Sequence, residues 1–179
     1  RNRFFAGDKI NTSEDRAVLH MALRGTGGTK AVQKDVKEMG ERLTAFAERM
    51  RASELFKAVV HIGIGGSDLG PRLVADAFQA SETASLELRF AENVDGASIN
   101  DALEGLDPKT TLVVVVSKSF TTQETRMNAE AARAWLQEAM GSRAGDNFIA
   151  VTANREGAEA FGIASSQIFD FWDWVGGRY

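Results

Sequence analysis

The run Thr-Leu-Val-Val-Val-Val at 111–116 constrains the fold more than any other feature of this sequence. Its β-branched residues favour extended backbone, and a strand that is apolar on both faces is usually buried on both faces. We therefore expect a central strand. Shorter apolar runs predict four more strands, at Lys57–Ile64, Leu86–Ala91, Asn147–Thr152 and Gln167–Phe171.

Segments with helical spacing of apolar residues separate these strands. They predict helices at Leu69–Gln79, Ala97–Leu103, Thr121–Met140 and Arg155–Phe161. Strands that alternate with helices form βαβ units, so we expect an α/β fold with a doubly wound, parallel, five-stranded sheet flanked by helices. Two N-terminal helices are expected before the first strand, at Ser13–Arg24, which Ser13 caps, and at Lys30–Arg51, which includes Gly40.

Composition excludes several classes of function. The chain of 179 residues has no cysteine and two histidines, which removes disulfides, thiolate catalysis and a cysteine-ligated zinc site. Its net charge of −4 gives no basic footprint for nucleic acid or an anionic membrane, and no apolar run approaches the ~18 residues of a membrane span. We expect a cytoplasmic protein with no metal, nucleic-acid partner or membrane partner.

The loop Gly63-Ile64-Gly65-Gly66-Ser67-Asp68-Leu69-Gly70-Pro71 leaves the first strand at the edge where open α/β sheets bind ligands. Its glycines either let backbone amides approach an anion or serve only a tight turn. A dinucleotide-binding loop is the competing interpretation, with Glu92 as the ribose-binding acid. It fails because the third glycine of that fingerprint falls on Asp68, whose charge would repel a pyrophosphate.

The central strand runs into Ser-Lys-Ser-Phe-Thr-Thr-Gln-Glu-Thr at 117–125. Thr121 and Glu124 match a capping box, which explains one hydroxyl. The other hydroxyls are better explained by a phosphate than by further capping, because its oxygens accept several hydrogen bonds. The glycine run of a Walker A loop is missing, and neutral donors with one lysine suit a monophosphate without magnesium.

The last ten residues, 170–179, combine aromatic side chains with two glycines and an arginine. We expect Phe171 and Trp174 to lie in the core. Arg178 either stabilises an oxyanion or phosphate in a cleft or is a surface arginine.

Together, Gly7–Arg24, Gly63–Pro71, Ser117–Thr125 and Asp173–Tyr179 resemble the glucose-6-phosphate isomerases, also called phosphoglucose isomerases. Members of that family have several hundred residues and two sugar-isomerase (SIS) domains with a flavodoxin-like sheet. The resemblance implies that this chain is a fragment, as does its start at Arg1 without methionine. It divides the chain into an N-terminal helical segment, 1–54, and a first SIS domain, 55–179.

The family interconverts glucose 6-phosphate and fructose 6-phosphate, in glycolysis and gluconeogenesis, through a cis-enediolate and without metal or redox cofactor. The resemblance assigns the substrate phosphate to one loop, with Ser117, Lys118, Ser119, Thr121 and Thr122. It places Gly66 and Ser67 on the sugar side of the cleft and makes Arg178 the catalytic residue that stabilises the enediolate. The active family member is a homodimer.

The family's general-base glutamate, and the histidine and lysine of ring opening, lie beyond Tyr179, and the histidine comes from the partner subunit. His20 and His61 do not match it, so we expect them to be packing or surface residues. The chain alone is therefore expected to be inactive. Ser119 replaces a threonine found in many members and keeps the hydroxyl. The alternative function is a non-catalytic SIS-type sensor of sugar phosphates, in which we would not expect the Arg178 motif or the Gly7–Arg24 motif.

Overall fold

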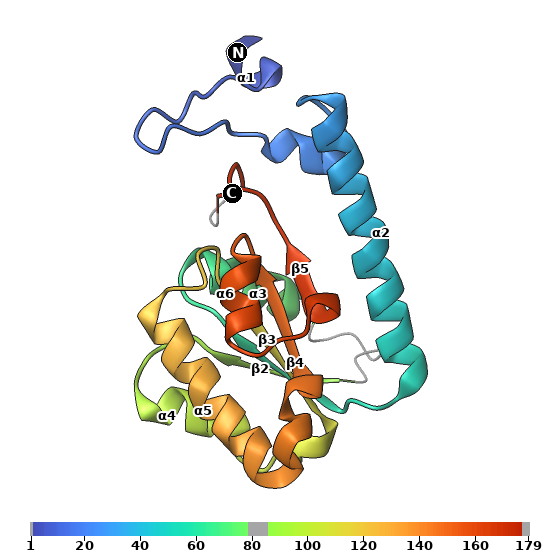
Figure 1. Cartoon of the computed structure of the whole chain (residues 1–179), viewed down its shortest axis with the longest axis vertical. Helices are drawn as coiled ribbons and strands as arrows, with labels where there is room; N and C mark the ends of the chain where they lie inside the picture. The colour runs from blue at the N-terminus through green and yellow to red at the C-terminus, as the bar shows by residue number, and fades with distance from the viewer. Residues whose placement is uncertain (1, 79–85, 177–179) are drawn as a thin grey trace.

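A five-stranded parallel sheet forms the centre of the computed structural model, which describes residues 2–78 and 86–176 (Figure 1). The strand order is β2-β1-β3-β4-β5 and every neighbouring pair is parallel. The strands are β1 (Ala58–Ile62), β2 (Glu87–Ala91), β3 (Thr111–Val116), β4 (Phe148–Thr152) and β5 (Ile168–Asp170). The predicted sheet is confirmed, with β3 in its middle.

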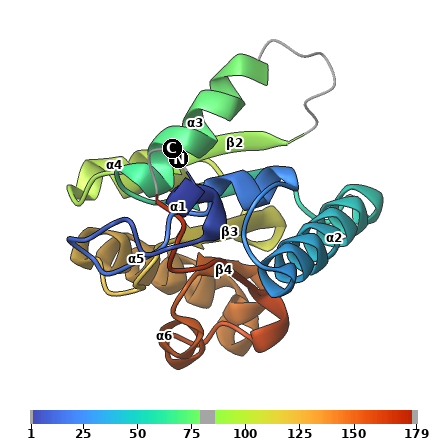
Figure 2. The ribbon, with the colours of Figure 1, turned by 90° about the horizontal axis from the view of Figure 1, so that it is seen from above.

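Helices cover both faces of the sheet, as the view from above shows (Figure 2). On one face, buried strand residues such as Val60, Val113 and Val115 pack beneath α4 (Gly96–Leu103), α5 (Gln123–Met140) and α6 (Arg155–Ala160). On the other, Leu112, Ile149 and Phe169 pack beneath α2 (Lys30–Ser53), and α3 (Gly66–Phe78) lies over the β2 side. Successive side chains of a strand point to opposite faces, so the apolar run of β3 supplies both cores.

The remaining elements are short. They are α1 (Asn2–Ala6) and four 3₁₀ helices, η1 (His20–Arg24), η2 (Pro108–Thr110), η3 (Gly141–Asn147) and η4 (Ser165–Gln167). The α2 helix continues past the end of the sheet and carries the N-terminal segment above the loop that follows β5 (Figure 1).

The predicted helix at Ser13–Arg24 is wrong, since only its last five residues are helical, as η1. The Asn11 side chain accepts hydrogen bonds from the Ser13 hydroxyl (2.8 Å) and the Glu14 amide (3.3 Å), and Asn11 pairs with Arg16 in a β-bridge. Asp15 has a φ of 50°. These local bonds offer the backbone a turn in place of a helix, which the apolar spacing did not reveal.

Candidate functional site

A pocket of about 380 Å³ lies where β1 and β3 end. These strands are parallel neighbours, with Ile62 beside Val115, so the loops that leave them meet at one edge of the sheet. The pocket brings together five of the predicted site residues, Ser67, Ser117, Lys118, Ser119 and Thr122. Gly66 and Thr121 belong to the same loops but do not line it. Glu14, Arg16 and Thr125 also line it, and the sequence had not singled them out.

The loop after β3 folds back on itself through its hydroxyls. Ser117 Oγ accepts a hydrogen bond from the Phe120 amide at 3.1 Å and donates to Thr122 Oγ1 at 3.5 Å. Ser119 Oγ accepts from the amide and the hydroxyl of Thr121, at 3.2 and 2.8 Å. Phe120 has a left-handed backbone, with φ 54°, a conformation that costs a non-glycine residue on the order of 1–3 kcal/mol and tends to occur at ligand sites.

The hydroxyls of this loop are not used to cap α5. Helix α5 begins at Gln123, and its N-cap residue, Thr122, makes no side-chain hydrogen bond to the first turn. The predicted capping box of Thr121 and Glu124 is therefore wrong, because the Thr121 hydroxyl bonds to Ser119 instead. The amides of the first turn, with the positive end of the helix dipole, remain available to an anion at this end of the helix.

Thr125 lies in the first turn of α5, three positions after Thr122 and therefore on the same side of the helix. Its side chain is 4% exposed and lines the pocket, and Oγ1 has no hydrogen-bond partner among the described residues. Burying an unpaired hydroxyl costs about 1–3 kcal/mol, so this position calls for a specific explanation. The only sequence signal for it was its place as the last hydroxyl of the run 117–125.

Lys118 ties this loop to the end of the described chain. Its ammonium donates to the backbone carbonyls of Asp173 (2.6 Å) and Val175 (2.9 Å), and Arg16 approaches the Asp173 carbonyl at 3.5 Å. Burial lowers the pKa of Lys118, and the positive charge of Arg16 lowers it further. The ammonium thus holds the 173–175 backbone, while its predicted contact with a phosphate stays a prediction.

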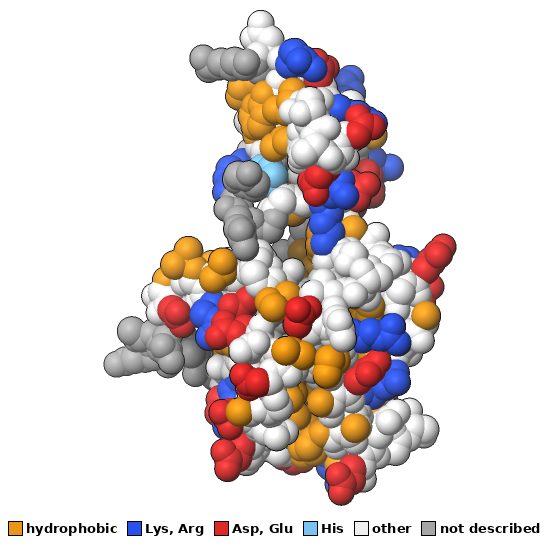
Figure 3. Space-filling model, turned by 90° about the vertical axis from the view of Figure 1, so that its left-hand side faces the viewer, with side chains coloured by type: hydrophobic (Ala, Val, Ile, Leu, Met, Phe, Trp, Pro, Cys, Tyr) orange, Lys and Arg blue, Asp and Glu red, His pale blue; other side chains and the backbone are white. Residues whose placement is uncertain are grey.

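His20 holds the same backbone from the N-terminal segment. The Gly176 amide donates to His20 Nε2 at 2.8 Å, so that nitrogen is an acceptor. The molecular surface is hollowed between the N-terminal segment and the sheet domain, where His20 and Lys118 line an open cavity of about 630 Å³ (Figure 3). Arg178, the predicted catalytic residue, lies outside the described residues.

The aromatic side chains after β5 are not core residues. Phe171 and Trp174 are half-buried, which corrects the prediction. Trp174 instead stacks on Trp172, with ring centroids 4.8 Å apart and planes 6° from parallel. The two indoles therefore pack on each other in the loop that follows β5.

His61 fixes the glycine loop on the other side of the pocket. It is buried, and its Nε2 donates to the Ser67 carbonyl at 2.8 Å. Gly63 makes this approach possible, since a Cβ there would lie 2.7 Å from the same carbonyl oxygen, and Gly65 supplies a φ of 58°. Burial lowers the pKa of His61, which favours the neutral ring. His61 is a packing residue, as expected.

The acidic residues near this loop are paired. Asp68 is 2% exposed and accepts two hydrogen bonds from Arg72, at 3.0 and 3.1 Å. Arg72 also donates to Glu92 at 2.7 Å and lies over the ring of Phe90. The hydrogen bond to Asp68 raises the pKa of Arg72. Arg72 neutralises much of this negative charge. Asp68 therefore repels an anion in the pocket less strongly than an unpaired aspartate in this loop would.

Comparison with known proteins decides the family. The model of the phosphoglucose isomerase family matches residues 1–179. The chain belongs to the phosphoglucose isomerase family. It is 48% identical to the glucose-6-phosphate isomerase of Caulobacter sp. (strain K31) and 44% identical to that of Deinococcus deserti, in each case over 100% of this chain and 36% of the relative. The chain thus spans about a third of the length of the curated relatives it matches.

A solved structure gives the same family. The glucose-6-phosphate isomerase of Chlamydia trachomatis superposes with a TM-score of 0.82 at 33% identity, covering 99% of this chain and 36% of that one.

The described residues contain no group of three or more His, Asp or Glu side chains that could hold a metal ion. No helix within residues 2–78 and 86–176 is long and apolar enough to span a bilayer.

Proposed function

We propose that this chain supplies the phosphate-binding part of a glucose-6-phosphate isomerase, which interconverts glucose 6-phosphate and fructose 6-phosphate as a cytoplasmic homodimer without metal or cofactor. The observation that carries the proposal is the pocket at the ends of β1 and β3, into which hydroxyls and the N-terminus of α5 converge. Membership of the isomerase family supports it.

The phosphate would lie against the loop that follows β3. The side chains of Ser117, Ser119 and Thr122 line the pocket. The hydroxyls of Ser119 and Thr122 can donate to the phosphate oxygens together with the first-turn amides of α5, and that of Ser117 can do so by turning from Thr122 Oγ1 to the ligand. Thr121 does not line the pocket but holds Ser119 in place, because its hydroxyl and amide both donate to Ser119 Oγ. Lys118 lies in the same loop, and its ammonium bonds to the backbone carbonyls of Asp173 and Val175.

The buried Thr125 hydroxyl fits the same role. A phosphate oxygen in the pocket would give it the partner that the described residues do not provide. Hydrogen bonds to charged groups contribute about 1.5–3 kcal/mol each, so such a bond would offset the cost of burying this hydroxyl.

The sugar would extend from the phosphate toward Ser67 and Gly66, at the start of α3. Arg178 would stabilise the negative charge of the cis-enediolate, an interaction that is worth several kcal/mol in a desolvated site. The base that moves the proton between the two sugar carbons, and the groups that open the ring, would come from polypeptide other than this chain. We also propose the division into an N-terminal helical segment, 1–54, and an SIS domain, 55–179; the first boundary falls just after α2 ends at Ser53.

Calorimetric titration of this chain with inorganic phosphate and with fructose 6-phosphate tests the phosphate site. We expect both to bind, and no turnover in a coupled isomerase assay, because the base is supplied elsewhere. Failure to bind either ligand would refute the phosphate site, and turnover by the isolated chain would refute the claim that the missing base is essential.

A further inference from the structure

Helix α3 turns its apolar side away from the sheet. A surface helix normally turns its apolar side to the core and its charges to solvent. In α3 the one buried residue is Asp68, whereas the apolar residues Leu69, Leu73, Val74 and Phe78 are 55–70% exposed. Their spacing is that of an ordinary amphipathic helix, so the helix has an apolar face that residues 2–78 and 86–176 do not cover.

The neighbouring edge strand continues this surface. Among the described strands, β2 lies at the edge of the sheet beside β1, and Leu88 and the preceding Leu86 are exposed. An open groove of about 870 Å³ runs between α3, β2 and α4, and its lining includes Phe78 and both leucines. We call the surface formed by Leu69, Leu73, Val74, Phe78, Leu86 and Leu88 the α3–β2 face; Figure 2 shows its two elements together at one side of the fold.

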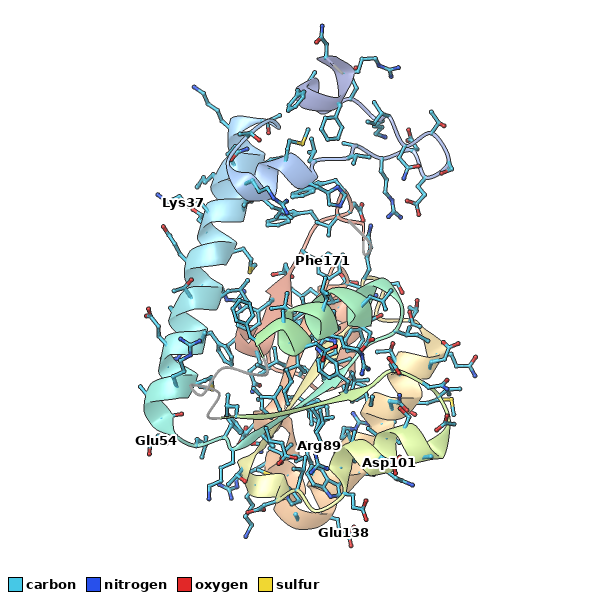
Figure 4. The ribbon with its side chains drawn as sticks, turned by 180° about the vertical axis from the view of Figure 1, so that it is seen from behind. Lys37, Glu54, Arg89, Asp101, Glu138 and Phe171 are labelled. Carbon is cyan, nitrogen blue, oxygen red and sulfur yellow. The ribbon has the colours of Figure 1, made fainter. Side chains whose placement is uncertain are left out.

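The two arginines beside this face already have partners. Arg72 is held by Asp68 and Glu92, and Arg89 donates to the Asp101 carbonyl at 3.2 Å (Figure 4). An apolar partner could therefore cover the face without leaving these arginines unpaired, which is the usual penalty for covering charge. The opposite side of the sheet differs, because α4 and α5 bury their apolar residues there.

We propose that the α3–β2 face is the surface on which the rest of an isomerase polypeptide packs. The relatives carry nearly two thirds of their length outside the region matched by this chain, and the chlamydial enzyme holds the same fold within such a longer chain. The occupant is thus a covalently joined segment with an apolar surface of its own.

The size of the face favours a joined segment over a second copy of this chain. At roughly 150 Å² for a fully exposed large side chain, its six residues expose about 500 Å². Stable complexes of free proteins bury about 800 Å² on each partner. A tethered segment needs less area, since its effective concentration is in the millimolar range.

Thiol labelling tests this directly, because the chain contains no cysteine. Leu73→Cys puts one thiol on the face, at the residue of it that is most exposed (70%), and Lys37→Cys is the matched control on the outer side of α2 (Figure 4). Each variant is made in this chain and in a joined protein in which this chain replaces the matched third of the Caulobacter isomerase.

We expect both thiols to react rapidly with a maleimide in this chain alone. In the joined protein, labelling at position 73 becomes at least tenfold slower at every protein concentration, while position 37 is unchanged. Equal labelling at 73 in both proteins overturns the proposal. Protection at 73 that grows with the concentration of this chain alone also overturns it and makes a second copy the occupant.

If the joined protein lacks a cooperative thermal transition, the cysteine is placed at the aligned position of the intact Caulobacter isomerase, where the same two outcomes apply. The readout is labelling and not turnover, so it does not depend on the proposed phosphate site.

Discussion

Replacing Thr125 by valine is expected to stabilise the fold and to weaken phosphate binding at the same time. Valine has nearly the shape of threonine but lacks the hydroxyl, whose oxygen is buried without a partner among the described residues. Removing an unsatisfied buried hydroxyl recovers part of a 1–3 kcal/mol penalty. We expect the free energy of unfolding to rise by about 1 kcal/mol, which is roughly 2–4 °C in Tm for a domain of this size.

Phosphate affinity is expected to change in the opposite direction. Losing one hydrogen bond to a charged oxygen costs about 1.5–3 kcal/mol, so Kd for inorganic phosphate should rise at least tenfold. Thermal unfolding with and without phosphate measures both effects, because a ligand that binds only the folded state raises Tm by an amount that grows with the logarithm of its concentration relative to Kd. Thr125→Ser keeps the hydroxyl and is expected to retain most of the phosphate-induced shift.

Thr111→Val is the matched control. Thr111 is fully buried, but its hydroxyl donates to the Asp107 carbonyl at 2.8 Å, away from the pocket. Its loss is expected to lower stability by about 1 kcal/mol and to leave phosphate affinity unchanged. If Thr125→Val is more stable and binds phosphate as tightly as the parent chain, the hydroxyl is not a ligand. If it is less stable, the hydroxyl has a partner and the reasoning fails at its first step.

Three further changes test other parts of the site. Ser117→Ala/Thr122→Ala removes two pocket hydroxyls and is expected to weaken phosphate binding about a hundredfold or more in calorimetry; unchanged binding would refute the cradle. Gly63→Ala puts a Cβ 2.7 Å from a carbonyl oxygen and should lower the free energy of unfolding in urea by about 1–3 kcal/mol. Gly40→Ala, where a Cβ in α2 meets open space, should raise it by about 0.5–1 kcal/mol. Burial lowers the pKa of His61 below 6.5 in the folded chain. As pH falls through 6.5, the unfolded chain therefore gains a proton that the folded chain does not, and the free energy of unfolding falls. His61→Gln should make this fall shallower, and an identical pH profile would contradict the assignment.

The sheet and the position of the pocket were predictable because both follow from local patterns. Five apolar runs separated by helical spacing leave few alternatives to a parallel sheet, and the strand ends then bring residues 63–67 and 117–122 together. Single side chains that bond to nearby backbone were not predictable. The Asn11 side chain forms a turn where apolar spacing indicated a helix, and the Thr121 hydroxyl bonds backward to Ser119 where a capping box was expected.

The orientation of α3 shows a different limit. Periodicity locates an apolar face but does not say what covers it, and Leu73 and Phe78 follow the pattern of core residues while pointing away from the core. Asp68 and Arg72 determine which side of α3 faces inward. A buried carboxylate requires a partner, and Arg72, one turn later, is the partner of Asp68 on the inward side of the helix.

The same pairing bears on how the pocket selects its ligand. Most charged side chains in or near the pocket contact other protein groups. Asp68 and Glu92 bond to Arg72, Lys118 donates to two backbone carbonyls, and Arg16 lies 3.5 Å from the Asp173 carbonyl and 3.9 Å from Glu14. Attraction between unit charges therefore contributes less than the number of basic residues nearby would imply. Besides Glu14 and Arg16, the pocket presents neutral hydroxyls and the first turn of α5, which act over hydrogen-bond distances. If the proposed phosphate site is correct, these donors distinguish a phosphate by the number and direction of its acceptor oxygens more than by its net charge.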